Sequence, residues 1–354
     1  IKPLGRKILL VYGKGSVLKN GSLANTKEEL IKAGAEIIEY SGIKPNPVIE
    51  DVDSAAALGI NQNVDLIVAV GGGSVIDSAK IIAICIHDGV KGWDIIKRKH
   101  EPKGAIPLIS VLTLAATGTE MNSVAVVQNN ITQEKLGYGH ISMYPKHSFL
   151  DPQYTVSVPA NYTAFGIIDL VAHCLEAWFG AGDASLSDRF VESIIKEALD
   201  YGPKLMQNLT DYNLRARIMW AATNALNGLT SYGRVSGDWA VHGLGHVLSF
   251  LYDTPHGASL SIVYPAWHRK IKERDSERIA FLGERLFNKR DADATILSLE
   301  NFFKELGSPV RLSEIGIDQD KFGEILRVMN LNRVSGMNHK LSEADRKEIL
   351  MMMA

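Results

Sequence analysis

The chain has few cysteines, almost no net charge and no long apolar run, and each shortage excludes a class of protein. Its two cysteines, Cys85 and Cys174, cannot build a disulfide framework or a cysteine-based zinc site. The formal net charge of −2 argues against nucleic acid or an anionic membrane as the main partner. No stretch is apolar over the length that a bilayer requires, and no secretory signal peptide is visible. Together these shortages favour a reducing compartment, and we expect a cytoplasmic protein.

Length and hydrophobic pattern predict two domains of different architecture. The chain has 354 residues, of which 46% are hydrophobic, enough for two domains with sizeable cores. Over the first 150 residues short apolar segments alternate with helical ones, which predicts a parallel sheet covered on both faces. Beyond residue 160 nearly every segment has helical periodicity. We therefore predict an α/β domain at 1–158 and an all-helical domain at 159–354.

The expected elements are bounded by changes of periodicity and by glycine and proline. Strands are expected at 7–13, 36–40, 65–70 and 106–111, and helices at 26–34, from 46 onward and at 77–87. In the second domain, helices are expected at 163–179, 185–200, 211–228, 237–250, 256–272, 276–288, 294–306 and 318–330.

One carboxylate and four histidines form two tight clusters in the second domain. Asp169 and His173 lie four residues apart, so they share one face of a helix. Further on, His242, His246 and His256 fall within fifteen residues. A carboxylate combined with imidazoles suits a divalent metal such as Zn²⁺ or Fe²⁺. The first pair alone is compatible with a surface or capping pair, and the three later histidines favour the metal.

Two glycine-rich turns follow apolar strands in the first domain. Residues 71–74 read Gly-Gly-Gly-Ser and residues 13–16 read Gly-Lys-Gly-Ser. Glycines let backbone N–H groups approach an anion closely, and a helix N-terminus adds a favourable dipole. A phosphate site is therefore expected at the first turn, with a weaker counterpart at the second; the alternative is a turn without a ligand. The residues concerned are Gly71, Gly72, Gly73, Ser74 and Gly13. Neither turn matches a P-loop, so an ATPase of that kind is not expected.

A threonine-rich segment follows the fourth expected strand. Residues 112–120 contain Thr113, Thr117 and Thr119, whose hydroxyls would lie at the carboxyl end of that strand. Ligands of parallel sheets bind at this edge. By itself the segment is equally typical of an ordinary polar loop.

The end of the second expected strand bears on the choice between NAD(H) and NADP(H). Folds that prefer NAD place an acidic residue there, which holds the ribose 2′-hydroxyl and repels a 2′-phosphate. Here the loop contains Ser41, Gly42 and Lys44 and no acid, although Glu39 precedes it. Lys44 could pair with a phosphate. This pattern favours NADP(H) over NAD(H), with the alternative that Glu39 turns toward the ribose and Lys44 is a solvated surface residue.

In combination, these motifs resemble the iron-containing (group III) alcohol dehydrogenases, in particular their butanol dehydrogenase and NADPH-dependent aldehyde reductase branch. The resemblance covers essentially the whole chain in order. The matching stretches are residues 42–47, 70–77, 112–120, 150–152, 168–173, 219–228, 238–246 and 251–257. The resemblance implies the group III alcohol dehydrogenase fold, also called dehydroquinate synthase-like, with a dinucleotide-binding first domain and a metal-binding, catalytic second domain.

The family's functional residues can be carried over position by position. The resemblance implies that the metal ligands are Asp169, His173, His242 and His256, and that the metal is Fe²⁺ or Zn²⁺. His246 matches a histidine beside the metal and the nicotinamide, and is a candidate proton relay; its alternative is a buried helix histidine. The resemblance further implies cofactor contacts at Asp77, Thr113, Thr117, Asn122 and Lys135, in addition to the glycine-rich turns and Ser41. Many relatives have proline where this chain has Val247.

The resemblance implies an NAD(P)-linked alcohol dehydrogenase or aldehyde reductase that acts on a small, butanol-like primary alcohol or its aldehyde. A homodimer is expected, without a nucleic-acid or membrane partner. Glycerol dehydrogenase and dehydroquinate synthase share the architecture, but their motifs differ from residues 112–120 and 238–257. A polyol dehydrogenase and a non-catalytic dinucleotide-binding protein are the alternatives. A binding protein, however, would not need four metal-ligating side chains.

Overall fold

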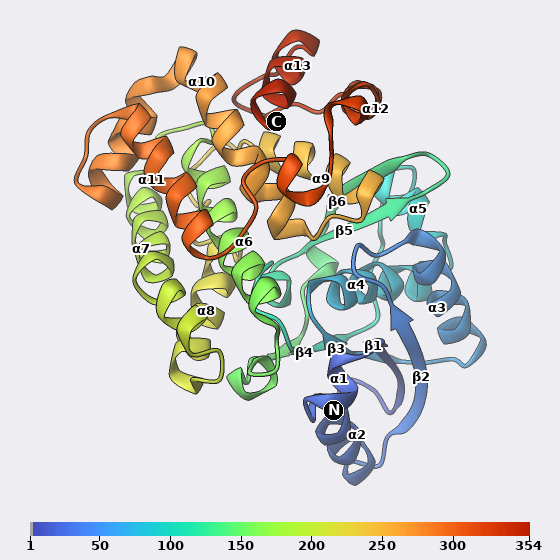
Figure 1. The fold of residues 1–354 in the computed structure, drawn as a ribbon. Helices are drawn as coiled ribbons and strands as arrows, with labels where there is room; N and C mark the ends of the chain where they lie inside the picture. Colours follow the sequence, from blue (N-terminus) through green and yellow to red (C-terminus); the bar gives the residue numbers. More distant parts are fainter. Residues whose placement is uncertain (1–2) are drawn as a thin grey trace. The chain divides into compact units, whose positions relative to one another are not determined.

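The computed structural model of the protein describes residues 3–354 (Figure 1). The chain divides into two compact units. Unit 1 runs up to Val158 and includes Leu209–Met219, whereas unit 2 comprises Pro159–Asn208 and Trp220–Ala354. Residues 209–219, which the sequence placed in the second domain, therefore belong to unit 1.

Unit 1 is an α/β domain with one main sheet and one hairpin. Its strands are β1 (Lys7–Gly13), β2 (Glu36–Ile43), β3 (Leu66–Gly71), β4 (Leu108–Leu112), β5 (Val124–Asn129), β6 (Glu134–Gly139) and β7 (His147–Phe149). Its helices are α1 (Ser16–Lys19), α2 (Ser22–Lys32), α3 (Ile49–Asn61), α4 (Gly73–Asp88) and α5 (Gly92–Ile96). The antiparallel hairpin β5–β6 and the short strand β7 were not expected from the sequence.

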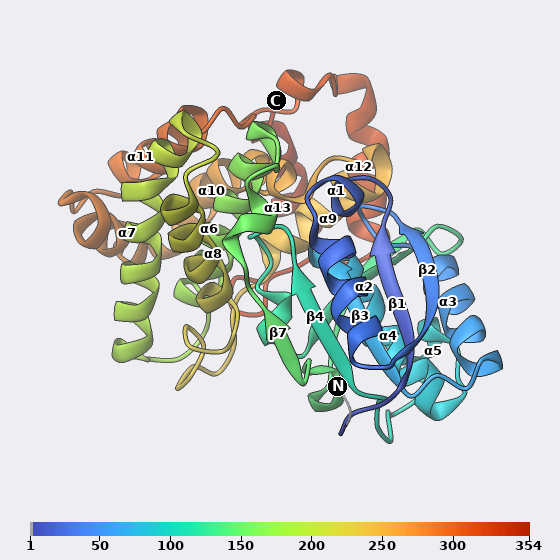
Figure 2. The same cartoon turned by 90° about the horizontal axis from the view of Figure 1, so that it is seen from below.

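The main sheet has the strand order β2-β1-β3-β4-β7, and all its pairs are parallel. Alternate residues of each strand enter two cores, because side chains of a strand point to opposite faces. Leu9 and Ile67 pack with α3 and α4, whereas Ile8 and Leu66 pack with α2. Figure 2 shows α2 on the opposite side of the sheet from α3 and α4. The chain leaves β1 toward β2 and β3 toward β4, so the topological switch point lies between β1 and β3.

Unit 2 contains helices and, within the described residues, no strand longer than an isolated bridge. Its helices are α6 (Ala160–Trp178), α7 (Ser185–Gln207), α9 (Ala240–Tyr252), α10 (His256–Phe287), α11 (Ala292–Glu305), α12 (Phe322–Leu331) and α13 (Glu343–Met352), and α8 (Tyr212–Ala225) runs into it from unit 1. The two helices expected at 256–272 and 276–288 are joined as α10, with a non-helical residue at Asp275. Helix α13 was not expected. Across residues 3–354, none of the helices combines the length and apolarity that crossing a bilayer demands.

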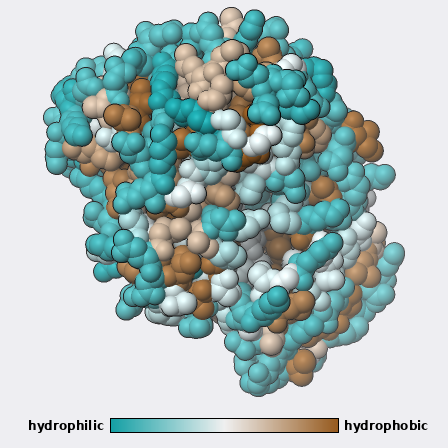
Figure 3. All heavy atoms as spheres, viewed as in Figure 1, coloured by the Kyte–Doolittle hydropathy of each residue, from teal (hydrophilic) through white to brown (hydrophobic). Residues whose placement is uncertain are grey.

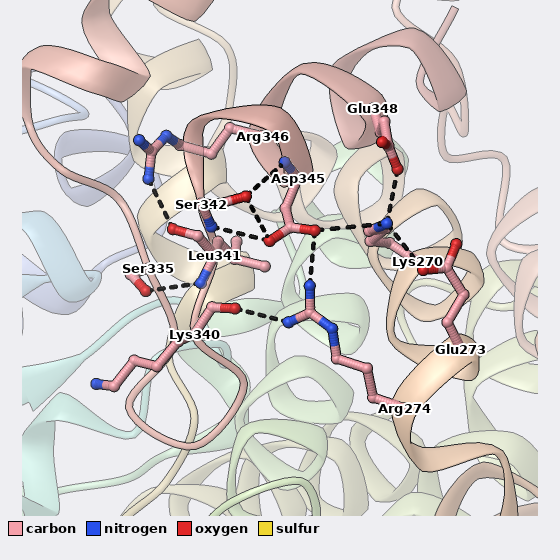
Figure 4. A network of polar contacts seen from close by, with 10 residues as sticks. All are labelled: Lys270, Glu273, Arg274, Ser335, Lys340, Leu341, Ser342, Asp345, Arg346 and Glu348. Carbon is pink, nitrogen blue, oxygen red and sulfur yellow. Dashed lines mark hydrogen bonds and ion pairs between the residues drawn. The ribbon is translucent and has the colours of Figure 1, made fainter.

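The C-terminal helix α13 is fixed by a polar network centred on Asp345 (Figure 4). Ser342 and Asp345 form a capping box, in which each side chain accepts a hydrogen bond from the other residue's backbone N–H. Asp345 also pairs with Arg274 at 2.6 Å and with Lys270 at 3.4 Å, both on α10. One carboxylate therefore starts α13 and attaches it to α10.

Both cysteines are buried, and neither forms a disulfide. Burial raises the pKa of the Cys85 thiol to about 12, and the pKa of the Cys174 thiol is also raised by burial. The face seen in Figure 3 is largely hydrophilic, with apolar residues in small patches. Isolated exposed apolar residues of this kind are normal for a protein surface.

Candidate metal centre and dinucleotide loops

Helix α6 presents Asp169 and His173 on one face. Fifteen of its nineteen residues are buried, because the helix is apolar on most sides and packs against α7 and α10. Asp169 is 2% exposed and His173 is 4% exposed. The i, i+4 spacing brings the two side chains together, with His173 Nε2 at 3.6 Å from Asp169 Oδ1.

Two further imidazoles come from α9 and from the first residue of α10. His242 Nε2 lies 3.8 Å and His256 Nε2 lies 3.5 Å from the same oxygen of Asp169. Between the two helices Asp253 adopts a left-handed conformation with φ of 51°, which ends α9. Gly257 then lets α10 begin against α6, because a side chain there would overlap the carbonyl oxygen of Phe165.

The donor set fits a divalent metal ion. Three imidazole nitrogens lie 3.5–3.8 Å from one carboxylate oxygen. The ligand atoms of Asp169, His173 and His242 all lie within 4.8 Å of one another, a group that does not include His256. Ligands bonded to a tetrahedral ion at about 2.0–2.1 Å would lie roughly 3.4 Å apart. Asp169 Oδ1 and His242 Nε2 are buried and have no hydrogen-bond partner, although unpaired buried polar atoms are rare. A cation between these atoms would satisfy both.

The electrostatics of the cluster agree with this interpretation. Burial would raise the pKa of Asp169, but the imidazoles of His173, His256 and His242 hold that pKa below its ordinary value. Burial lowers the pKa of His173 to about 4, which keeps that ring neutral, as a metal ligand must be. Burial opposes protonation of His242 as well, but the carboxylates of Asp169 and Glu176 raise its pKa to about 9. A metal ion would take the place of the proton on His242 Nε2.

A second carboxylate, which the sequence analysis missed, supports the cluster. Glu176 Oε1 accepts a hydrogen bond from His242 Nδ1 at 2.8 Å, and Glu176 is 1% exposed. It follows His173 by three residues on α6, so the helical spacing already placed it near the same face. Its partner is more than sixty residues away, and that pairing cannot be read from the sequence.

His246 lies at the edge of the cluster. Its ring centroid is 5.5 Å from that of His256 and 6.4 Å from that of His242. It is only partly buried, unlike the three residues Asp169, His173 and His242. Helical spacing puts it one turn after His242 on α9. It is therefore near the candidate metal ligands and more accessible to solvent.

The glycine-rich turns lie at the switch point of unit 1. Gly13 ends β1 and Gly71 ends the neighbouring β3, with Tyr12 paired to Val70 just before them. Gly72 precedes α4 and Ser74 lies in its first turn, whose backbone N–H groups lack helical acceptors. A Cβ on Gly73 would lie 2.7 Å from the Thr117 hydroxyl, so the threonine-rich segment closes directly over this turn.

Thr113 and Thr117 both contact the glycine turn: the Thr113 N–H donates a hydrogen bond to the Gly71 carbonyl at 3.0 Å, and Thr117 lies against Gly73. Asp77 and Asn122 instead bond to groups outside the turn. Asp77 accepts hydrogen bonds from Thr119 Oγ1 at 2.6 Å and from Val126 N at 2.9 Å, so both its oxygens are engaged. Asn122 Oδ1 accepts a hydrogen bond from the fully buried Lys80 ammonium at 3.0 Å. These residues hold the segment in place from the side of α4.

The remaining expected cofactor residues lie elsewhere in unit 1. Lys135, on β6, donates a hydrogen bond to Asn46 Oδ1 at 2.7 Å. Ser41 is exposed near the end of β2. Next to it Gly42 has φ of 96°, and a Cβ there would lie 3.3 Å from Cε of Lys14. The structure thus groups Gly13, Lys14 and Ser41 at one end of the sheet.

Comparison with known proteins agrees with this arrangement. Residues 1–152 match the family model for iron-containing alcohol dehydrogenase, and residues 163–353 match the C-terminal model of the Fe-containing alcohol dehydrogenase family. The chain is 39% identical to a probable NADH-dependent butanol dehydrogenase of Bacillus subtilis, over 99% of this chain and 92% of that protein. It is 37% identical to an NADPH-dependent aldehyde reductase of Escherichia coli, over 96% of this chain and 90% of that protein.

Solved structures give the same result. The crystal structure of an NADH-dependent butanol dehydrogenase from Thermotoga maritima superposes with a TM-score of 0.96 at 35% identity, covering 100% of this chain and 92% of that one. The match extends over both units, and the predicted α/β and helical architecture is confirmed. The chain therefore belongs to the iron-containing alcohol dehydrogenase family and is an NAD(P)-linked oxidoreductase of its butanol dehydrogenase and aldehyde reductase branch.

Proposed function

We propose that the protein interconverts a small primary alcohol and its aldehyde, with a divalent metal ion held by Asp169, His173, His242 and His256. The observation that carries the proposal is the set of three imidazole nitrogens at 3.5–3.8 Å from Asp169 Oδ1. Butanol-like substrates are supported by the names of the relatives, which include butanol dehydrogenases and an aldehyde reductase.

The four ligands define the chemistry of the centre. When bound, Fe²⁺ or Zn²⁺ supplies Lewis acidity that polarises the substrate oxygen, and the nicotinamide supplies or accepts hydride. Three neutral imidazoles and one carboxylate neutralise only one of the ion's two charges. Burial of Asp169 and His173 keeps water from these side chains. The residual positive charge favours a developing negative charge on oxygen.

His246 is proposed as the group that passes a proton between the substrate oxygen and solvent. Support comes from its place one turn after His242 and from its partial exposure. Histidine is the residue type most often used for such transfers. In a His246→Gln variant, metal affinity should stay within about twofold while kcat falls by roughly 10²-fold. A kcat equal to that of the wild type would overturn the relay.

We propose a preference for NADP(H) over NAD(H). Glu39, the acid that would repel a 2′-phosphate, accepts a hydrogen bond from Tyr12 at 2.6 Å and pairs with Lys27 at 2.7 Å. Lys14 and Lys44 flank the end of β2 and can pair with a phosphate. The relatives include both NADH-dependent and NADPH-dependent enzymes.

The test is a steady-state assay with a panel of aldehydes, each with NADH and NADPH, on protein of known metal content. Butanal and similar short aldehydes should oxidise the reduced cofactor at 340 nm, with a higher kcat/KM for NADPH. Turnover of glycerol or dihydroxyacetone alone would indicate a polyol dehydrogenase. Cofactor binding without turnover of any aldehyde would overturn the proposal. We also propose a homodimer on the strength of the family resemblance, which light scattering can check.

A further inference from the structure

Glu176 is almost fully buried, and its carboxylate accepts three hydrogen bonds from the start of α9. Glu176 Oε1 accepts hydrogen bonds from His242 Nδ1 at 2.8 Å and from the His242 backbone N–H at 3.0 Å. Glu176 Oε2 accepts a hydrogen bond from the backbone N–H of Trp239 at 2.5 Å. The side chain is 1% exposed, so water cannot substitute for these donors.

Helix α9 begins without a conventional cap. Its N-cap residue Trp239 is left-handed, with φ of 68°, and its side chain makes no capping hydrogen bond. The first N–H groups of a helix need acceptors from outside the helix, and their dipoles favour a negative charge. Glu176 supplies that charge from α6, and Asp238 Oδ2 accepts from Ala240 N at 3.3 Å. The start of α9 is therefore fixed by a carboxylate from another helix.

The same carboxylate selects how the His242 ring is protonated. An imidazole that donates Nδ1–H to an anion presents the lone pair of its Nε2 on the opposite side. In His242 that Nε2 faces Asp169 Oδ1 at 3.8 Å and has no hydrogen-bond partner. Histidine ligands of metals almost always have such a partner, which fixes the tautomer and raises the basicity of the ligating nitrogen.

We propose that Glu176 is a positioning residue for the metal centre, which holds His242 in the tautomer and orientation needed for ligation through Nε2. Three of its hydrogen bonds restrain His242 and the residue that begins its helix, so the ring and its backbone are fixed together. This inference rests on the proposed metal centre. It adds a residue that contacts neither the metal nor the substrate.

The test compares metal affinity in Glu176→Gln and Glu176→Met with that in a matched control. Glu192→Gln is the control, because Glu192 is also a buried glutamate of unit 2 and pairs with Arg285 at 2.8 Å, away from the metal ligands. Co²⁺ or Zn²⁺ is titrated in competition with a chromophoric chelator. Affinity should fall about 10-fold in the glutamine variant and about 100-fold in the methionine variant. The control should stay within twofold of the wild type, whatever its loss of thermal stability.

A second measurement needs no variant and covers the case in which the substituted proteins do not fold. In the zinc-loaded wild type, ¹⁵N-histidine NMR should show a slowly exchanging proton on His242 Nδ1. Affinities within threefold of the wild type in both glutamate variants, or an unprotonated Nδ1 in the zinc form, would overturn the role of Glu176. Failure of the wild type to bind Co²⁺ or Zn²⁺ would instead overturn the metal centre itself.

Discussion

Asp169 is a carboxylate in surroundings that exclude water. At 2% exposure, a charged side chain needs a partner of opposite sign, and its Oδ1 has no hydrogen-bond donor among the described residues. The neighbouring His173 is also buried, and the pKa of about 4 for its imidazole keeps that ring neutral. Without a metal, a protonated His242, whose pKa is raised to about 9, supplies one positive charge beside Asp169, and the ion of the proposed metal centre would replace that proton.

The contribution of a single ligand can be tested at His256. A His256→Ala change removes the imidazole at 3.5 Å from Asp169 Oδ1 and leaves three of the four proposed ligands. Metal content and activity should both be lost. The circular dichroism spectrum should stay that of the wild type, because His256 is the first residue of α10 and alanine is compatible with a helix. Full metal occupancy together with full activity in this variant would remove His256 from the ligand set.

A side chain at Gly72 should block the phosphate turn. A Cβ there would lie 3.1 Å from Cβ of Leu114, and valine would add two further methyl groups in the same space. The turn would lose its close backbone approach to an anion, so Gly72→Val should weaken dinucleotide binding by at least about 10-fold. Fluorescence titration measures this change, and Gly15→Ala, where a Cβ meets nothing within 4 Å, serves as the control. Equal affinities in the two variants would contradict the placement of the phosphates.

Lys80 should give unit 1 an unusual response to alkaline pH. Burial lowers its pKa to about 8 from an ordinary value of 10.5, although the charges of Asp77 and Glu120 oppose the shift. The folded state therefore releases this proton before the unfolded state does. Protonation of Lys80 therefore costs the folded state free energy of unfolding. That free energy is fully present above pH 10.5 and is lost as the pH falls through 8.

The variant Lys80→Met has no such proton to release. Between pH 8 and pH 10.5 the wild type should gain stability relative to this variant, by on the order of 2–3 kcal/mol. Urea unfolding at several pH values measures the difference, and the shared effects of other lysines cancel. If the difference in free energy of unfolding between the two proteins does not change with pH, Lys80 has the same pKa in the folded and unfolded states.

At the scale of elements, the attachment of α13 depends on one residue. Asp345 caps the helix and pairs with Arg274 and Lys270 on α10. An Asp345→Asn change should therefore destabilise unit 2 by about 2 kcal/mol near neutral pH. A matched control is Asp293→Asn, which removes an exposed carboxylate paired with Lys272.

The effect of Asp345 should also depend on pH. Burial would raise its pKa, but hydrogen bonds from Ser342 and Arg274 hold the pKa below its ordinary value. Stability from such a carboxylate is present above its unfolded pKa of about 3.9 and is lost as the pH falls through the lower folded value. The wild type and Asp345→Asn should accordingly converge in acid. If the difference in free energy of unfolding between the two proteins stays constant from pH 7 to pH 2, the charge of Asp345 does not contribute to stability.

The elements that the sequence predicted well are those with strong periodicity. The spacing of Asp169 and His173 fell on α6 as expected, and the strands that end at Gly13 and Gly71 were placed to within one or two residues. Helix α13 was missed because its mean hydropathy is low and its buried face is partly polar, including Asp345. The hairpin β5–β6 was missed because it lies outside the main sheet, where no alternation with helices marks it.

The site was predictable only where its residues are neighbours in sequence. Helical spacing joins Asp169 to His173, but nothing in the sequence brings His242 next to Glu176, because tertiary packing makes that contact. For the same reason Lys80 was unremarkable in the sequence, where a lysine is expected to be exposed. Buried polar networks form between segments that are distant in the sequence, so the sequence does not predict which residues will be partners.

At the scale of the whole molecule, the candidate ligand groups are divided between the units. The proposed metal ligands all belong to unit 2, and both glycine turns belong to unit 1. A ligand stabilises the unit that binds it by RT ln(1 + [L]/Kd), about 2.7 kcal/mol at a hundredfold excess over Kd. Zn²⁺ should therefore protect unit 2 from limited proteolysis, and the dinucleotide should protect unit 1. Removal of metal with a chelator should reverse only the first effect, as mass spectrometry of the fragments would reveal.

The two buried cysteines give the experimenter an unmodified background for site-directed labelling. With pKa values raised by burial, neither Cys85 nor Cys174 carries the thiolate that maleimides and methanethiosulfonates attack. A cysteine introduced at an exposed position, such as Ile31 in unit 1 or Val235 in unit 2, should then react alone. Spin labels at one such position in each unit would allow the distance between the units to be followed by pulsed electron paramagnetic resonance as metal, cofactor and aldehyde are added in turn.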